Sequence, residues 1–244
     1  MGTSNIYNGP KDKKSKHGQT NETLSWRELK SFLTRFISSN SGTPKKLLAN
    51  YVKCLGGNNG ALLKSKAGLI SGGNLIDFIN LMQEIGLEKT LESYDIEYKD
   101  KQIEVVLSEL INKLSPNSAT KEDCISRMAM SDTLSYFYSY IELNHLDIKI
   151  LNSIDEALIA KLLTIFFASY VFNKFMVDLE SRFDRSKEEY QKLSTKENDI
   201  KSLINSIVDI SISKMNLSKK IENPQEISRK LLNDCYQYLE VLND

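Results

Sequence analysis

The sequence has few of the residues that usually build reactive sites. Its 244 residues include three cysteines and two histidines. Cys54, Cys124 and Cys235 lie far apart and form no Cys-x-x-Cys pair, so their spacing predicts neither a zinc site nor a disulfide framework. His17 and His145 have no cysteine, serine or carboxylate partner at a spacing typical of a metal site or a proton relay. We therefore expect no metal, no cofactor, and thiols that are reduced and buried.

Signals of membrane attachment are also scarce. The longest uncharged apolar run, Leu162–Phe172, is too short to cross a bilayer. The first residues lack the apolar segment of a secretory signal, and Ile6 stands where a myristoylation pattern requires serine or threonine. We expect a cytoplasmic protein that has no membrane contact.

The charge is balanced overall but unevenly spread. Lys and Arg number 32, as do Asp and Glu. Residues 1–73 hold 12 basic and 3 acidic residues (+9), which leaves 20 basic and 29 acidic residues (−9) in residues 74–244. A basic front can attract an anionic partner, or it can dock on the acidic body. The acidic body itself argues against a DNA-binding surface there.

Apolar side chains recur at helical spacing along most of the chain. Helix starts are indicated by three Ser/Glu capping boxes, a Thr-Pro pair, a capping threonine and an Asn-Pro pair. They lie at Ser25 and Glu28, Thr43 and Pro44, Thr120, Ser153 and Glu156, Ser194 and Glu197, and Asn223 and Pro224. The stretch from Ala157 to Val177 is apolar almost all round, which is typical of a central helix. We predict an all-α fold, an irregular multi-helix bundle around this central apolar helix.

The predicted organisation is a tail followed by one domain. Residues 1–23 are polar, carry four lysines and show no apolar periodicity, so we expect a disordered basic tail. Residues 24–242 form the predicted helical domain, which contains a Lys- and Gly-rich segment at 43–73.

This Lys- and Gly-rich segment is the most unusual part of the sequence. Six of the eleven glycines lie between positions 56 and 73, and no acid occurs from Thr43 through Ile76. A phosphate-binding loop needs Gly-Lys-Ser/Thr after a strand, whereas here three residues separate Gly60 from Lys64 and a helix precedes them. Two interpretations remain open: close helix crossings at the glycines, or lysines that contact an anion or a nucleic-acid backbone. The lysines are Lys45, Lys46, Lys53, Lys64 and Lys66.

Four blocks of the sequence resemble the QatB family of the bacterial Qat anti-phage defence system. They are the opening Met-Gly-Thr-Ser-Asn-x-Tyr-x-Gly-Pro-Lys at 1–11, the amphipathic helix Lys30–Ile37, the Leu-Ala-Asn-Tyr to Gly-Gly stretch at 48–57, and Tyr170–Phe175 with Asp178–Glu180. In the glycine segment this chain uses Lys, Asn and Leu where family members often have Arg and Ala.

The resemblance implies a non-enzymatic subunit of a multi-gene antiviral system. The expected companions are a P-loop ATPase (QatA), a QueC-like enzyme (QatC) and a TatD-like nuclease (QatD), and catalysis would lie in them. Nucleic-acid binding is the alternative: the basic front would then act as a sensor of nucleic acid or nucleotide.

The resemblance also draws attention to the N-terminal Gly2, Thr3 and Ser4 as a modification or partner-binding site. Removal of Met1 would leave a free α-amine on Gly2, whose pKa of about 7.7–8.0 is far below the value of about 10.4 for a lysine. A QueC-like enzyme, which normally couples ammonia to an ATP-activated deazapurine carboxylate, could couple this amine instead. A flexible start without any modification is the competing interpretation.

Overall fold

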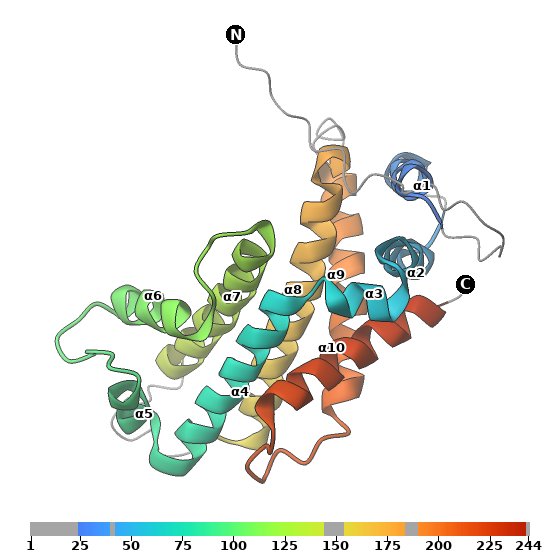
Figure 1. The fold of residues 1–244 in the computed structure, drawn as a ribbon. Helices are drawn as coiled ribbons and strands as arrows, with labels where there is room; N and C mark the ends of the chain where they lie inside the picture. Colours follow the sequence, from blue (N-terminus) through green and yellow to red (C-terminus); the bar gives the residue numbers. More distant parts are fainter. Residues whose placement is uncertain (1–23, 40–41, 144–153, 184–189, 243–244) are drawn as a thin grey trace.

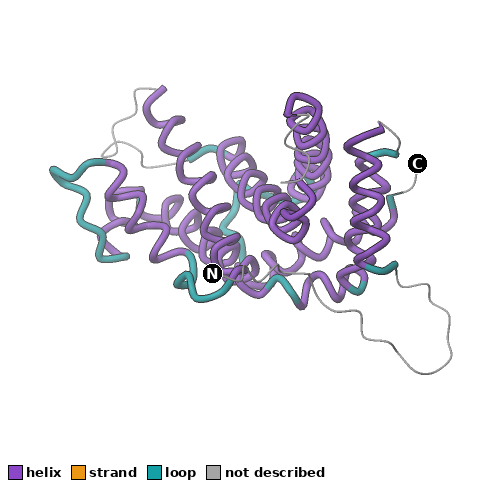
Figure 2. Tube along the Cα trace, turned by 90° about the horizontal axis from the view of Figure 1, so that it is seen from above, coloured by secondary structure: helices purple, strands orange, loops and turns teal. Residues whose placement is uncertain are grey.

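The computed structural model describes residues 24–39, 42–143, 154–183 and 190–242, and within these ranges it contains ten α-helices and no strand (Figures 1 and 2). The predicted all-α class is confirmed. The helices are α1 Trp26–Ser39, α2 Pro44–Leu55, α3 Gly57–Leu63, α4 Lys66–Ile85, α5 Leu87–Ser93, α6 Ile103–Leu114, α7 Lys121–Leu143, α8 Glu156–Phe183, α9 Tyr190–Ile212 and α10 Pro224–Val241. The predicted tail at 1–23 and His145 lie outside the described residues.

The N-terminal helices begin and end where the capping residues predict. Ser25 N–H donates to Glu28 Oε2 at 2.8 Å, and Glu28 N–H donates to Ser25 Oγ at 3.3 Å, which completes the reciprocal box before α1. Thr43 Oγ1 accepts from the Lys46 N–H at 3.3 Å at the start of α2. Gly56 ends α2 in the left-handed conformation with φ 102°, which favours glycine.

One capping box does not mark a helix start, and at another the start of the helix is capped by a different residue. Ser194 lies inside α9, which already begins at Tyr190, so the third box is wrong as a start. A serine and a glutamate three residues apart are also neighbours on the surface of a helix interior, so the pattern alone does not fix the first turn. At α8, Asp155 Oδ1 accepts from the Leu158 N–H at 2.7 Å and takes the capping role, while Ser153 is outside the described residues.

Helix α4 starts at Lys66 and runs through Gly68, Gly72 and Gly73, so this part of the Lys- and Gly-rich segment is helical. A Cβ at Gly72 would lie 2.8 Å from Phe167 Cζ, and one at Gly68 would overlap the Tyr170 ring. These glycines therefore let α4 approach α8 closely, as the first interpretation of the segment expects. The short α5 was not predicted.

Helix α8 is the central helix of the bundle. It packs against α7, α9, α4 and α1 (Figure 1). Five large side chains of the Ala157–Val177 stretch are all 0% exposed, which confirms the prediction of a central apolar helix: Phe166, Phe167, Tyr170, Val171 and Phe175. The segment Glu156–Glu180 has the length and hydropathy of a membrane span, but 67% of the apolar window is buried inside the fold, as in the core helix of a folded domain.

The thiols differ in their surroundings. Cys235 is buried, and burial raises the pKa of its thiol to about 12. Cys54 is half-buried and Cys124 is exposed, so the prediction of uniformly buried thiols is wrong for Cys124. Cys124 shares its face of α7 with Met128, one turn further along, which is 48% exposed.

Candidate functional site

The residues that the sequence singled out do not form one site within the described part of the chain. Gly2, Thr3 and Ser4 precede its first residue, Leu24. The lysines are distributed over two helices and a turn, and all are exposed: Lys45 and Lys46 in the first turn of α2, Lys53 in its last turn, Lys64 after the end of α3, and Lys66 at the start of α4.

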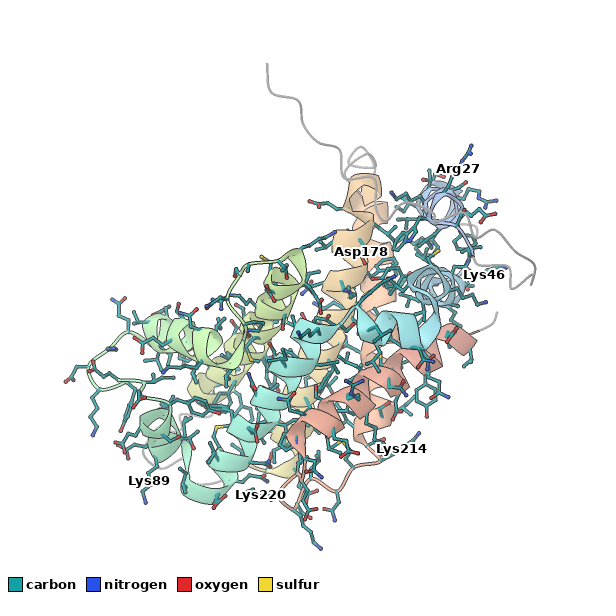
Figure 3. The ribbon with its side chains drawn as sticks, viewed as in Figure 1. Arg27, Lys46, Lys89, Asp178, Lys214 and Lys220 are labelled. Atoms are coloured by element: carbon teal, nitrogen blue, oxygen red, sulfur yellow. The ribbon has the colours of Figure 1, made fainter. Side chains whose placement is uncertain are left out.

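Lys64 has a structural contact of its own. Its Nζ donates to the carbonyl oxygen of Leu55 at 2.8 Å, so its charge lies at the C-terminal end of α2, where a cation is favourable. Lys46, which is labelled in Figure 3, lies at the opposite end of α2, in its first turn. Contact of the five lysines with an anion stays a prediction.

A buried polar cluster lies beside this segment, and the sequence reasoning missed it. At its centre is Lys174 of α8, which is only 6% exposed and whose Nζ donates to the Lys64 carbonyl oxygen at 2.7 Å. Burial lowers the pKa of the Lys174 ammonium, while the carboxylates of Asp178 and Glu122 act in the opposite direction. We call Lys174 and the side chains around it the Lys174 cluster.

Three tyrosines belong to the Lys174 cluster, and each hydroxyl has a polar partner. Their bonds are Tyr51 Oη to Asp178 Oδ2 at 2.8 Å, Tyr170 Oη to Glu122 Oε1 at 2.9 Å, and Tyr236 Oη with Ser65 Oγ at 2.9 Å. Burial is the largest cause that raises the pKa of all three phenols. They are therefore neutral at physiological pH.

The carboxylates of the cluster join separate helices. Glu122 Oε1 also accepts from the Ala67 N–H at 2.8 Å, so α7 supports the first turn of α4. Asp178, labelled on α8 in Figure 3, lies 3.4 Å from the Lys121 Nζ and connects α8 to α7 as well as to α2. The cluster thus holds the Lys- and Gly-rich segment against α8, and its polar groups are committed to that packing.

In the sequence, only one residue indicates that a buried polar cluster exists. Lys174 interrupts a stretch that is otherwise apolar almost all round, and a buried ammonium requires partners. Which partners it finds depends on the tertiary arrangement, since Lys64 is 110 residues away.

A polar concavity lies on another side of α8. A groove of about 730 Å³ is lined by side chains of α7, α8 and α9, and we call it the α8 groove. Helix α8 provides its floor, because Thr164 and Ser169 are 2% and 5% exposed. Helix α9 contributes a polar stripe, at helical spacing, to one wall: Asn198, Lys201, Ser202, Asn205, Ser206 and Asp209.

Buried hydroxyls orient one carboxylate on each wall of the α8 groove. Thr164 Oγ1 donates to Asp209 Oδ1 of α9 at 2.6 Å. Ser169 Oγ donates to Asp132 Oδ2 of α7. Within the described residues, the second oxygen of each carboxylate has no hydrogen-bond partner, so it is free to accept from a ligand.

Two lysines add positive charge to the α8 groove. The Nζ of Lys161 lies 5.9 Å from the centre of the Tyr136 ring, and the Nζ of Lys201 lies 5.7 Å from that of Phe172. Among the described residues neither lysine forms an ion pair with Asp132 or Asp209. The groove therefore offers unpaired charges of both signs to a polar ligand.

The sequence alone does not distinguish this groove from an ordinary solvent face. The α9 stripe is polar at helical spacing, as any exposed helix face is. The α9 stripe becomes one wall of a groove only because α7 also packs against α8 and forms the other wall. The described residues contain no group of three His, Cys, Asp or Glu side chains that could hold a metal ion.

The chain is similar to a known protein family. A family model described as "Qat anti-phage system associated protein QatB" matches residues 56–239. The matched range includes α4 to α9, with Lys174 and the α8 groove, and the 170–180 block of the sequence resemblance. The blocks at 1–11 and 30–37 lie before it. No curated protein and no solved structure matches the chain.

Proposed function

The chain belongs to the QatB family and is a component of an anti-phage defence system, and from that premise we propose that it is a non-enzymatic subunit which acts through its companions. One observation supports this role most directly. The ionisable side chains of the Lys174 cluster form hydrogen bonds that hold separate helices together. The two hydroxyls that donate to a carboxylate in the α8 groove, those of Ser169 and Thr164, are only 5% and 2% exposed, whereas a catalytic nucleophile must reach its substrate.

Its N-terminus is the second part of the proposal. Gly2 would be the substrate of the QueC-like companion, with Thr3 and Ser4 forming the small, polar surroundings that this enzyme binds. The Gly2 nitrogen would form an amide bond with the ATP-activated carboxyl carbon of a deazapurine. The activating group would leave with the electrons of its bond to that carbon, and the nitrogen would lose a proton. A free α-amine suits this step, because at neutral pH a larger fraction of it is uncharged than of an ordinary exposed lysine.

The remaining partners follow from membership of a multi-gene system. We expect direct contact with the QueC-like enzyme and assembly with the P-loop ATPase and the TatD-like nuclease, all in the cytoplasm. The helical domain would act as the scaffold that presents the N-terminal segment to the enzyme.

Intact mass spectrometry tests the modification. The chain is purified after expression alone and after expression with the QueC-like companion, and the N-terminal peptide is then sequenced by mass. We expect added mass on Gly2 only in the second preparation, and none on a Gly2→Glu variant. Unchanged mass in both preparations, or equal added mass on Gly2→Glu, would remove the substrate role and leave the subunit role standing.

A further inference from the structure

We propose that the α8 groove binds the N-terminal segment of its own chain, with lysines of residues 11–16 placed on Asp132 and Asp209. This is an interaction within the subunit. It does not depend on whether Gly2 is modified, because residues 1–10 would extend beyond the groove and leave Gly2 accessible to an enzyme.

The polar groups of the α8 groove are suited to an extended polypeptide that carries ammonium groups. The unpaired oxygens of Asp132 and Asp209 are acceptors whose positions are fixed by the buried hydroxyls of Ser169 and Thr164. A fixed carboxylate binds a cation with less loss of side-chain entropy than a mobile one. The wall also carries asparagine side chains, each of which presents a donor and an acceptor that match a peptide N–H and C=O.

Asp132 and Asp209 lie on different walls of the α8 groove, on α7 and α9. Their supporting residues, Ser169 and Thr164, are five residues apart on α8, so they face sides of the helix roughly 140° apart. Successive residues of an extended chain point to opposite sides. Lys13 and Lys14 are adjacent in the sequence, so an extended segment in the groove can direct one ammonium toward each wall.

The described domain begins close enough for this contact. The Trp26 ring packs on Tyr51 with centroids 6.2 Å apart, and Tyr51 packs on Phe175 at 5.2 Å. Phe175 is six residues from Ser169, or about 9 Å along α8. The ten residues from Lys16 to Trp26 span up to about 33 Å when extended. The lysines therefore reach the groove, and the covalent connection gives them a high effective concentration there.

Charge favours the tail over a nucleic acid as the occupant. A phosphate backbone in the groove would meet Asp132 and Asp209, and repulsion would oppose its entry. The tail instead brings four lysines against two acids, Asp12 and Glu22. Its acidic residues can in turn approach Lys161 and Lys201, which have no carboxylate partner within the described residues.

Carbodiimide cross-linking of the full-length chain tests the contact directly, since the reagent joins a lysine amine to a carboxylate that touches it. We use an equal mixture of unlabelled and ¹⁵N-labelled protein, so that links within one molecule differ in mass from links between two. We expect peptides with Lys11–Lys16 joined to Asp132 and Asp209 within one molecule. Links of these lysines only to other carboxylates, or only between molecules, would overturn the proposal.

Variants provide a second readout that does not depend on the reagent. In Asp132→Asn/Asp209→Asn, trypsin should cleave after the tail lysines roughly fivefold faster than in the wild type, which corresponds to about 1 kcal/mol of lost docking free energy. Asp199→Asn is the matched control, because Asp199 is exposed on α9 and does not line the groove. Thermal melting verifies that all three proteins are folded. Equal cleavage rates in the wild type and the double variant would contradict the docking.

Discussion

The ammonium of Lys174 donates a hydrogen bond of 2.7 Å to the main-chain oxygen of Lys64, and so the central helix α8 holds the turn between α3 and α4. Two of the exposed lysines lie there: Lys64 in this turn and Lys66 as the first residue of α4. The buried Lys174 thus fixes the position of part of the Lys- and Gly-rich segment. Its contribution to folding can be measured.

Replacing Lys174 with methionine should destabilise the domain by about 1–3 kcal/mol, because it removes the hydrogen bond that the buried ammonium donates to the Lys64 main-chain oxygen. Methionine keeps most of the volume, so the loss reports the polar contact. The matched control is Lys161→Met, an exposed lysine on the same helix, which should change stability by less than about 0.5 kcal/mol. Urea denaturation measures both values, and equal stability of the two variants would contradict the structural role of Lys174.

Stability should fall at alkaline pH through the buried tyrosines. Burial raises the pKa of Tyr236 above that of a phenol in the unfolded chain, so above about pH 10 the unfolded state loses this proton first. The raised pKa therefore contributes stability that is present below about pH 10 and is lost as the pH rises beyond it.

Two tyrosine variants separate this effect from general alkaline damage. Tyr236→Phe should flatten the decline of the melting temperature above about pH 10. Tyr238→Phe, two residues along α10 and 37% exposed, should leave the decline as in the wild type. Identical pH profiles for the two variants would show that Tyr236 titrates as an ordinary phenol.

Gly72→Ala puts two opposing effects in competition. Helix propensity alone favours alanine by about 1 kcal/mol. However, the added Cβ would lie 2.8 Å from Phe167 Cζ, and overpacking of this kind costs about 1–3 kcal/mol. Because the clash is with a ring that is itself fully buried, we expect net destabilisation in urea denaturation. A more stable variant would show that α4 and α8 have room between them.

The exposed lysines allow a test of the alternative role as a nucleic-acid sensor. If the surface of α2 and the α3–α4 turn binds a phosphate backbone, affinity for single-stranded DNA should fall steeply with salt. Replacing Lys45, Lys46 and Lys53 with serine should then make this salt dependence shallower. We expect binding that is weak and unchanged by the substitutions, as measured by fluorescence anisotropy. A steep salt dependence that these substitutions abolish would favour the sensor.

The sequence predicts local structure well where one residue decides it. Thr43, Pro44 and Gly56 fix the ends of α2 through caps and a left-handed turn that depend on neighbours only. Ser194 misleads because a capping pattern can also occur inside a helix. The start of α4 is harder to predict, because its glycines are poor helix formers and close packing against Tyr170 and Phe167 overrides that preference.

The polar sites depend on long-range packing and could not be located beforehand. Lys174 was visible as a charge in an apolar stretch, but its partner Lys64 is supplied by a distant part of the chain. Asp132 and Asp209 are two ordinary acids on separate amphipathic helices. They become a pair of fixed acceptors only when Ser169 and Thr164 of α8 lie between them.

Co-purification from cells that express the four-gene set tests the central claim that this chain works through its companions. A tag on its C-terminus is used, so that the N-terminal segment stays free. We predict that the QueC-like enzyme is retained through size-exclusion chromatography, and that the chain purified alone hydrolyses no nucleotide and cuts no nucleic acid. A chain that elutes without any companion, yet shows turnover that follows it through every column, would contradict the account.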